Sequence, residues 1–276
     1  MTVSAKEVQE LRKMSGAGMM ECKNALTDSG GDINQAFKIL REKGIAKAEK
    51  KSSRDANEGL IGVKVEKESA VIIEVNSETD FVSRNSEFHE LVNSIMDIYI
   101  NEEDNLLLED NKNVTELVNA AVGKIGENIV LKRSCKLNGN IYSYVHNSVS
   151  DGLGKIGVLL NLESDSDKIT EIGKNICMHI AALRPKSISV EDLDTEIVNS
   201  EKEIIKQQLK DSGKPDNILE KMMDGKLKKF YEENTLMGQK FVMDPTITVA
   251  QYINQYSEKY KSKISIKQFI RYEIGS

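Results

Sequence analysis

The chain has 276 residues, enough to bury a sizeable core and to divide into two or more units. Its formal net charge of −6, with 38 basic and 44 acidic residues, argues against DNA or RNA as its main partner, because nucleic-acid-binding surfaces are basic. The three cysteines are widely spaced, which argues against a disulfide framework. The sequence shows no signal pattern and no apolar run of the roughly 18 to 20 residues that a membrane helix needs. We therefore predict a cytoplasmic protein.

Residues 1–46 predict three short helices, which we call the N-terminal module. A Ser-x-x-Glu capping box begins the first helix, glycines separate the helices, and Gly44 is expected to end the third. Met19 and Met20 point about 100° apart on a helix, so at least one is a candidate contact residue. The apolar residues expected to face the core of this module are Val8, Leu11, Met14, Met19, Cys22, Ala25, Leu26, Ile33, Ala36, Phe37 and Leu40.

The middle of the chain predicts a mixed region of strands and helices. Residues 47–57 are charged and lack large apolar groups, which is typical of a linker or an exposed helical extension. Residues 60–66 and 70–75 predict a β-hairpin. Helices are expected over the apolar face from Phe88 to Tyr99 and over residues 114–125. Further strands are expected at residues 129–137, 141–145 and 156–162.

The second half of the chain predicts helices and one late strand. A helix ends at Arg184-Pro185 and is expected to bury Ile169, Ile172, Ile176, His179, Ile180 and Leu183. Residues 190–230 predict an antiparallel helical hairpin with a turn at 213–215. A final strand is expected at residues 269–274. The resulting α+β organisation has a core of two subdomains, residues 58–138 and residues 139–189 with 231–276, and the hairpin is an insertion in the second.

A polar turn that contains one aromatic side chain, residues 77–85, follows the strand at 70–75. Taken alone, Phe81 is more often a core residue than an exposed one. Thr79 or Asp80 is expected to be the N-cap of the next helix. Glu78 and Asp80 have the chemistry for acid–base work, but nothing in the sequence indicates a pocket around them.

Two other patterns carry little functional weight. The G-x-G-x-x-G run at residues 152–157 precedes a strand, whereas a dinucleotide site needs it after a strand and before a helix, so we expect a glycine turn. The three histidines and three cysteines show no metal-ligand spacing. Cys177 and His179 are two residues apart on a helix and therefore point in different directions.

Five blocks resemble the translation elongation factor Ts family and occur in the order of that family. They span nearly the whole chain, and together they are far more specific than any one of them. The blocks are LRKMSGAGMMEC with the following KNAL at residues 11–26, EVNSETDFV at 74–82, KIGENI at 124–129, SGKP at 212–215 and GQKFVM at 238–243.

The resemblance implies a guanine-nucleotide exchange factor for elongation factor Tu that is not itself an enzyme. No cofactor, tightly bound small molecule, direct nucleic-acid contact or membrane contact is expected. The family has an N-terminal module similar to ubiquitin-associated domains, an α+β core with small antiparallel sheets, and an inserted coiled-coil hairpin. Some members continue past the last strand into a further C-terminal helix, whereas this sequence ends at Ser276, and the contacts of that helix are therefore not carried over.

The resemblance also implies which residues touch the partner. Thr79, Asp80, Phe81 and Val82 match the segment that docks on the GTPase domain and dislodges the Mg²⁺ bound with GDP. The residues that match a second contact on that domain are Leu11, Met19 and Met20. The residues that match a Tyr-x-His stretch facing another domain of the partner are Tyr144 and His146.

Two alternatives come from other functional classes. An adaptor with a ubiquitin-associated-like binding module would explain the N-terminal module but not the block at residues 79–82. An enzyme that holds a nucleotide at residues 152–157 is the other, and direct binding of NAD or GTP by the isolated protein would favour it.

Overall fold

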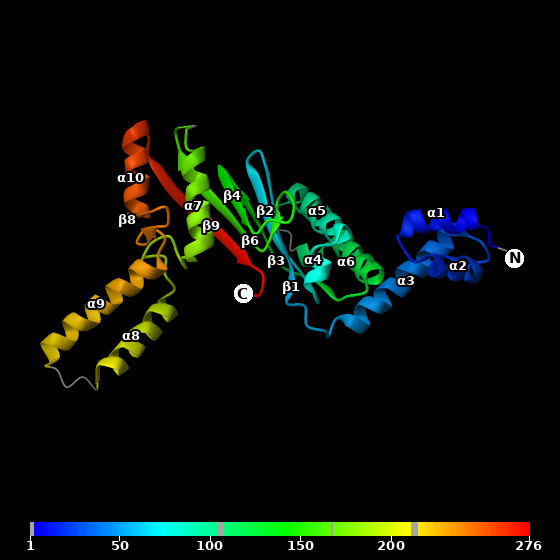
Figure 1. The fold of residues 1–276 in the computed structure, drawn as a ribbon, viewed down its shortest axis with the longest axis horizontal. Helices are drawn as coiled ribbons and strands as arrows, with labels where there is room; N and C mark the ends of the chain where they lie inside the picture. The colour runs from blue at the N-terminus through cyan, green and yellow to red at the C-terminus, as the bar shows by residue number, and fades with distance from the viewer. Residues whose placement is uncertain (1–2, 104–107, 167, 211–214) are drawn as a thin grey trace. The chain divides into compact units, whose positions relative to one another are not determined.

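The structure is a computed structural model that describes residues 3–103, 108–166, 168–210 and 215–276. It consists of helices and small antiparallel sheets (Figure 1), which confirms the predicted α+β class. The chain divides into two units. Unit 1 is Met1–Lys136, Val145–Gly157 and Tyr272–Ser276, and unit 2 is Leu137–Tyr144 and Val158–Arg271. In the described part of the chain, no helix combines the length and apolar character needed to cross a membrane.

Unit 1 begins with three packed helices, α1 (Ala5–Ser15), α2 (Met19–Asp28) and α3 (Ile33–Lys51). The predicted capping box is confirmed, because the Glu7 amide donates to the Ser4 hydroxyl and the Ser4 amide donates to the Glu7 carboxylate. The residues that form the small core are Val8, Leu11, Cys22, Ala25, Leu26 and Ala36.

Met14 and Met19 were expected in that core, but both are exposed, so this prediction was wrong. They flank the loop between α1 and α2. Ser15 and Cys22 approach each other there, with 3.7 Å between Oγ and Sγ, and the Cys22 thiol donates to the Ala17 carbonyl. Cys22, and neither methionine, is the buried side chain at this end of the core.

The third helix does not end at Gly44 as predicted, and α3 continues to Lys51. The reason is tertiary: a Cβ on Gly123 of α6 (Lys112–Ile125) would lie 3.5 Å from the Cα of Gly44. The two helices therefore cross at a pair of glycines, and packing overrides the low helix propensity of Gly44. Of the two readings of residues 47–57, the helical extension holds as far as Lys51.

The main sheet of unit 1 has the strand order β3-β2-β1-β5. The predicted hairpin is confirmed as β1 (Glu58–Glu66) and β2 (Ser69–Ser77), which pair antiparallel with Leu60 opposite Val75. The strands beside them are β3 (Ile129–Asn138) and β5 (Leu153–Gly154).

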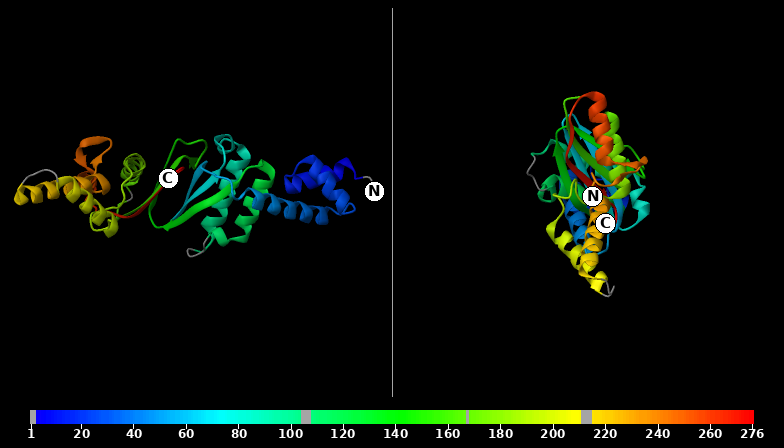
Figure 2. Two further views of the ribbon diagram at one scale, coloured as in Figure 1. Left: turned by 90° about the horizontal axis from the view of Figure 1, so that it is seen from below. Right: turned by 90° about the vertical axis from the view of Figure 1, so that its left-hand side faces the viewer.

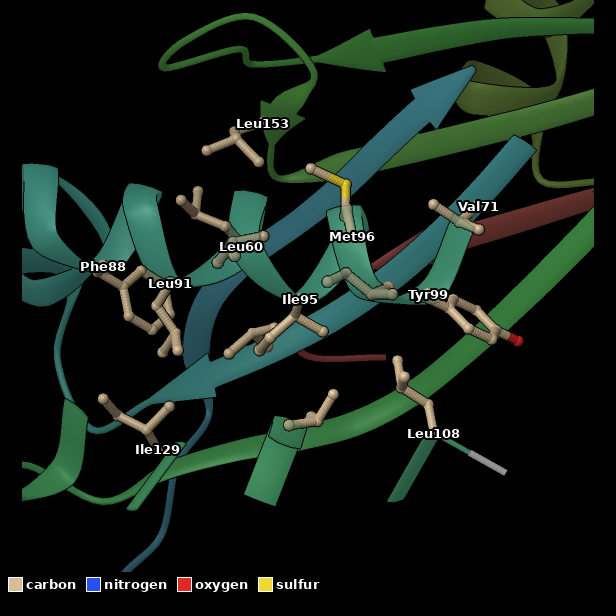
Figure 3. Packing of buried hydrophobic residues seen from close by; sticks show 14 of the residues in the cluster. Leu60, Val71, Phe88, Leu91, Ile95, Met96, Tyr99, Leu108, Ile129 and Leu153 are labelled. Atoms are coloured by element: carbon tan, nitrogen blue, oxygen red, sulfur yellow. The ribbon is translucent and has the colours of Figure 1, made fainter. Parts of the chain in front are cut away.

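Helix α5 (Ser86–Asn101) packs its apolar face on β1 and β2, with Phe88, Ile95 and Met96 directed toward the strands (Figure 3). The short helix η1 (Leu108–Asp110) adds Leu108 to the same core. This core packs against β2, so it supports the segment that follows the last residue of β2.

Most residues of a three-stranded sheet with the order β4-β6-β9 belong to unit 2. Its strands, all expected from the sequence, are β4 (Ile141–His146), β6 (Ile156–Ser164) and β9 (Ile264–Glu273). The buried side predicted for α7 (Thr170–Leu183) is correct except for Leu183, which is exposed. The chain turns away at the next residue, where Arg184 has φ 51°, so Leu183 lies beyond the packed face.

Unit 2 also contains elements that were not predicted, namely β7 (Lys240–Phe241), β8 (Asp244–Thr248) and α10 (Val249–Tyr260). The expected helical pair is α8 (Thr195–Lys210) and α9 (Asp216–Asn234), which lie side by side (Figures 1 and 2). Ile205, Leu209 and Leu227 form the buried seam between them. Of the predicted turn, Gly213 and Lys214 lie outside the described residues, and Pro215 is the N-cap of α9.

Candidate functional site

The segment after β2 exposes one aromatic ring. Phe81 lies on α4 (Asp80–Ser83), a single helical turn between β2 and α5. It is 80% exposed, the largest fraction among the large apolar side chains of the described residues, whereas Val82 is 7% exposed and belongs to the core of unit 1. The helical turn is thus attached to the core on one side and presents a phenyl ring to solvent on the other.

The N-terminal end of α4 is held by Glu127. The Thr79 amide donates to Glu127 Oε2 at 3.0 Å, and the Thr79 hydroxyl donates to Glu127 Oε1 at 2.7 Å. Thr79 does occupy the N-cap position, as expected, but its side chain makes no capping hydrogen bond and its hydroxyl is directed to Glu127.

Glu78 is anchored by the residue that follows Glu127. The Asn128 amide donates to Glu78 Oε1 at 2.6 Å, Arg54 reaches the same oxygen at 3.3 Å, and the Asn128 side chain donates to the Arg54 carbonyl at 2.7 Å. The hydrogen bond from Asn128, helped by the charge of Arg54, lowers the pKa of Glu78. Glu78 is therefore an ionised anchor in this structure.

Asp80 lies beside the exposed ring. Its carboxylate accepts a hydrogen bond from Arg84 at 3.0 Å, and both side chains are largely exposed. Such a surface ion pair adds little stability, so its main effect is to place two opposite charges next to Phe81. Within the described ranges, no group of three or more His, Cys, Asp or Glu side chains is arranged to hold a metal ion. The arrangement presents an exposed phenyl ring beside one acidic and one basic side chain.

The N-terminal module exposes two adjacent methionines. Met19 is 54% and Met20 is 65% exposed, at the first turn of α2. Leu11, which the family resemblance assigns to the same contact, is fully buried in the core of the module. In this structure the methionines are therefore accessible to a partner, and Leu11 supports the helices that carry them.

Tyr144 and His146 lie two residues apart on β4, so they share one face of the strand. His146 is exposed and Tyr144 is partly buried. His179 has a different environment, because it is fully buried in unit 2 and bonded to Gln239. Burial also raises the pKa of Cys177, which makes it a poor nucleophile.

The glycine run at residues 152–157 is not one turn as expected: Gly152 lies in a turn, Leu153–Gly154 is β5, and Ile156 begins β6. The Gly152 carbonyl accepts from the Val63 amide at 2.8 Å, and a Cβ on Gly152 would lie 2.5 Å from the Val63 carbonyl oxygen. Strand β6 begins within the run, at Ile156, so a strand stands where a dinucleotide fingerprint requires a helix N-terminus.

Glu127 and Arg54 were missed as site residues. The signal was present in part, because Glu127 belongs to the block at residues 124–129 that carries the family resemblance. That two blocks almost 50 residues apart meet at Thr79 follows only from the fold, in which the segment between α6 and β3 crosses the end of β2.

Comparisons with known proteins agree on one family. The family model described as Elongation factor TS matches residues 78–276. An Elongation factor Ts of Bartonella bacilliformis is 44% identical over 287 residues, which cover 100% of this chain and 94% of that protein. An Elongation factor Ts of Paracoccus denitrificans is 47% identical over 257 residues, which cover 91% of this chain and 87% of that protein.

Proposed function

This chain belongs to the elongation factor Ts family and is a guanine-nucleotide exchange factor for elongation factor Tu, and we propose that α4 is the element that drives GDP release. In this proposal Phe81 enters the GTPase beside the Mg²⁺ bound with GDP, with Thr79, Asp80 and Val82 holding the turn that carries it. Mg²⁺ demands near-ideal octahedral geometry, so a small displacement of its surroundings weakens its binding. GDP then binds the GTPase more weakly.

The main support is the exposure of Phe81 on an anchored turn. Burying one phenyl ring contributes about 1.5–3 kcal/mol. A thousandfold faster release of GDP needs a barrier lower by about 4 kcal/mol. Phe81 therefore supplies a large part of the effect, and the rest has to come from a wider interface.

Two further surfaces complete that interface in the proposal. The N-terminal module, through Met19 and Met20 together with Leu11, makes a second contact on the GTPase domain. Tyr144 and His146 face another domain of elongation factor Tu. The support is that Met19, Met20 and His146 are exposed, together with the match of these residues to family positions.

The architecture and setting of the family are proposed for this chain as well. The N-terminal module is similar to ubiquitin-associated domains, residues 190–230 are an inserted coiled-coil hairpin, and residues 58–138 and 139–189 with 231–276 are the two core subdomains. The protein works in the cytoplasm, binds elongation factor Tu and needs no nucleic acid, membrane or small-molecule cofactor. The net charge of −6 supports the exclusion of nucleic acid.

Release of labelled GDP from elongation factor Tu tests the role of Phe81. Wild type should accelerate release strongly, and Phe81→Ala should lose at least tenfold of that acceleration, because the wedge is removed while the anchors remain. Val65→Ala is the matched control, since Val65 is another exposed apolar residue of unit 1, at the far end of β1. Full acceleration by Phe81→Ala would contradict the proposal.

The same assay with a magnesium chelator tests the step at which Phe81 acts. If the ring works by dislodging Mg²⁺, removing the ion beforehand should shrink the difference between wild type and Phe81→Ala. A difference that stays the same without Mg²⁺ would show that Phe81 acts at another step.

A further inference from the structure

We infer that Glu127 is a positioning residue for nucleotide exchange, which sets the direction of α4 and therefore of Phe81; this inference rests on the role proposed above for α4. Glu127 does not belong to the segment that carries the ring. It lies between α6 and β3 and reaches across to Thr79, the residue directly before α4.

The geometry is that of a two-point grip. One carboxylate oxygen accepts the Thr79 amide at 3.0 Å and the other accepts the Thr79 hydroxyl at 2.7 Å. Two hydrogen bonds to Thr79 fix both its backbone and its side-chain rotamer. A single hydrogen bond would allow Thr79 to rotate about the line that joins the donor and acceptor atoms. Hydrogen bonds to a carboxylate are also stronger than bonds between neutral groups.

Helix α4 needs this grip because it has only four residues. A single turn has no stability of its own, since helix nucleation fixes several residues for one hydrogen bond. Val82 holds the far side of the turn in the core, and the pair between Asp80 and Arg84 is exposed and weak. Glu127 fixes the position of Thr79, at the end of α4 where the chain leaves β2.

The grip matches a carboxylate. Both groups of Thr79 that face Glu127 donate in this structure, and a carboxylate offers a charged acceptor to each. Glu127→Gln keeps the size of the side chain but loses the charge, and it can bond both groups only if the Thr79 hydroxyl turns to accept from the amide, so two charge-assisted bonds become neutral ones. Thr79→Val keeps the shape of Thr79 and removes its hydroxyl, and Thr79→Ser keeps the hydroxyl.

The test measures GDP release from elongation factor Tu at saturating exchange factor, together with the half-saturating concentration. Glu127→Gln should lower the maximum rate about tenfold, equivalent to ~1.4 kcal/mol, and should change the half-saturating concentration less. Thr79→Val should lower the rate as well, and Thr79→Ser should retain more of it. Glu116→Gln, on α6, is the matched control because its carboxylate pairs with Arg41 at an exposed site, and its rate should equal that of wild type.

A double variant separates positioning from general loss of structure. If Glu127 acts through the ring, Glu127→Gln should cause no further loss when Phe81 is already alanine. An equal loss in both backgrounds, or a full rate for Glu127→Gln alone, would overturn the inference. A full rate for Phe81→Ala overturns the role of α4 and the inference together, whereas a slow Phe81→Ala beside a fast Glu127→Gln overturns the inference alone. Thermal unfolding checks each variant, and Thr79→Val carries the same test if Glu127→Gln does not fold.

Discussion

His179 is a buried side chain whose two ring nitrogens have different partners. The Val242 amide donates to Nδ1 at 3.1 Å, so Nε2 carries the proton and donates to Gln239 Oε1 at 2.9 Å. The Gln239 amide group in turn donates to the carbonyls of Leu183 and Glu233. This network satisfies the ring only while it is neutral, and burial lowers the pKa of His179.

The stability of unit 2 should therefore decrease in mild acid. Below the ordinary histidine pKa of about 6.5, the unfolded chain takes up a proton at this position that the folded chain refuses. The free energy of unfolding should fall by up to about 1.4 kcal/mol per pH unit from this residue. Urea unfolding at several pH values between about 5 and 7.5 gives the free energy of unfolding as a function of pH. This free energy should change less with pH for His179→Asn than for wild type. An equal change in both proteins would mean that the pKa of His179 is the same in the folded and unfolded chains.

At the residue scale, sequence indicated the kind of site but not its geometry. Phe81 and Val82 are adjacent apolar residues, and burial statistics alone place both in the core. The family blocks pointed to an exposed Phe81, and the structure shows that ring in solvent and Val82 buried. The grip of Glu127 on Thr79 had no sequence signal of its own, because hydrogen bonds across 48 residues depend on the fold.

At the scale of elements, three glycines within helices have different surroundings. Gly44 and Gly123 lie at the crossing of α3 and α6, where a side chain on either one approaches the other helix. Gly225 lies inside α9 and would meet no atom within 4 Å if it carried a Cβ. The first pair permits close packing, whereas Gly225 only reduces the helix propensity of α9.

These surroundings predict opposite effects of substitution. Gly225→Ala should raise the free energy of unfolding of the hairpin by about 0.4–1 kcal/mol, because alanine limits the unfolded chain without a clash. Gly123→Val should lower the stability of unit 1 by about 1–3 kcal/mol, because its methyl groups force α3 away from α6. Hydrogen exchange in each unit, monitored as urea is added, measures both changes in stability. If Gly123→Val stabilised unit 1, the close packing of α3 on α6 at this position would be contradicted.

Elements with strong periodicity were predictable, and the errors have physical causes. The β1–β2 hairpin and α5 followed from their apolar patterns. The end of α3 was misplaced because the sequence does not show that Gly44 packs against Gly123 of α6. Helix α10 was missed although Thr248 and Gln251 form a capping box that the sequence displays. The domain limits at residues 139–189 and 231–276 stay a prediction.

At the scale of the whole molecule, the exchange reaction links two binding equilibria. If this protein weakens the binding of GDP to elongation factor Tu by some factor, GDP weakens the binding of this protein by the same factor. The exchange factor therefore works in both directions, and the supply of GTP decides the net direction.

Phe81→Ala should reduce this coupling factor more than it reduces affinity for nucleotide-free elongation factor Tu. The reason is that, in the role proposed for α4, the ring and the bound Mg²⁺ compete for one arrangement of the GTPase, whereas the other proposed surfaces bind with or without nucleotide. Dissociation constants measured with and without GDP, for wild type and the variant, give the factor directly. An equal loss of affinity for both forms of elongation factor Tu would assign Phe81 to binding alone.

The grip on Thr79 also has a kinetic consequence. Since α4 is ordered before any partner arrives, little conformational entropy remains to be lost there on association. A preorganised surface of this kind docks at roughly 10⁵–10⁷ M⁻¹ s⁻¹, without waiting for a segment to fold. In the proposed role, we expect the binding of a new nucleotide to the GTPase, and not any folding of α4, to set the residence time, so that one molecule of exchange factor serves many GTPases in succession.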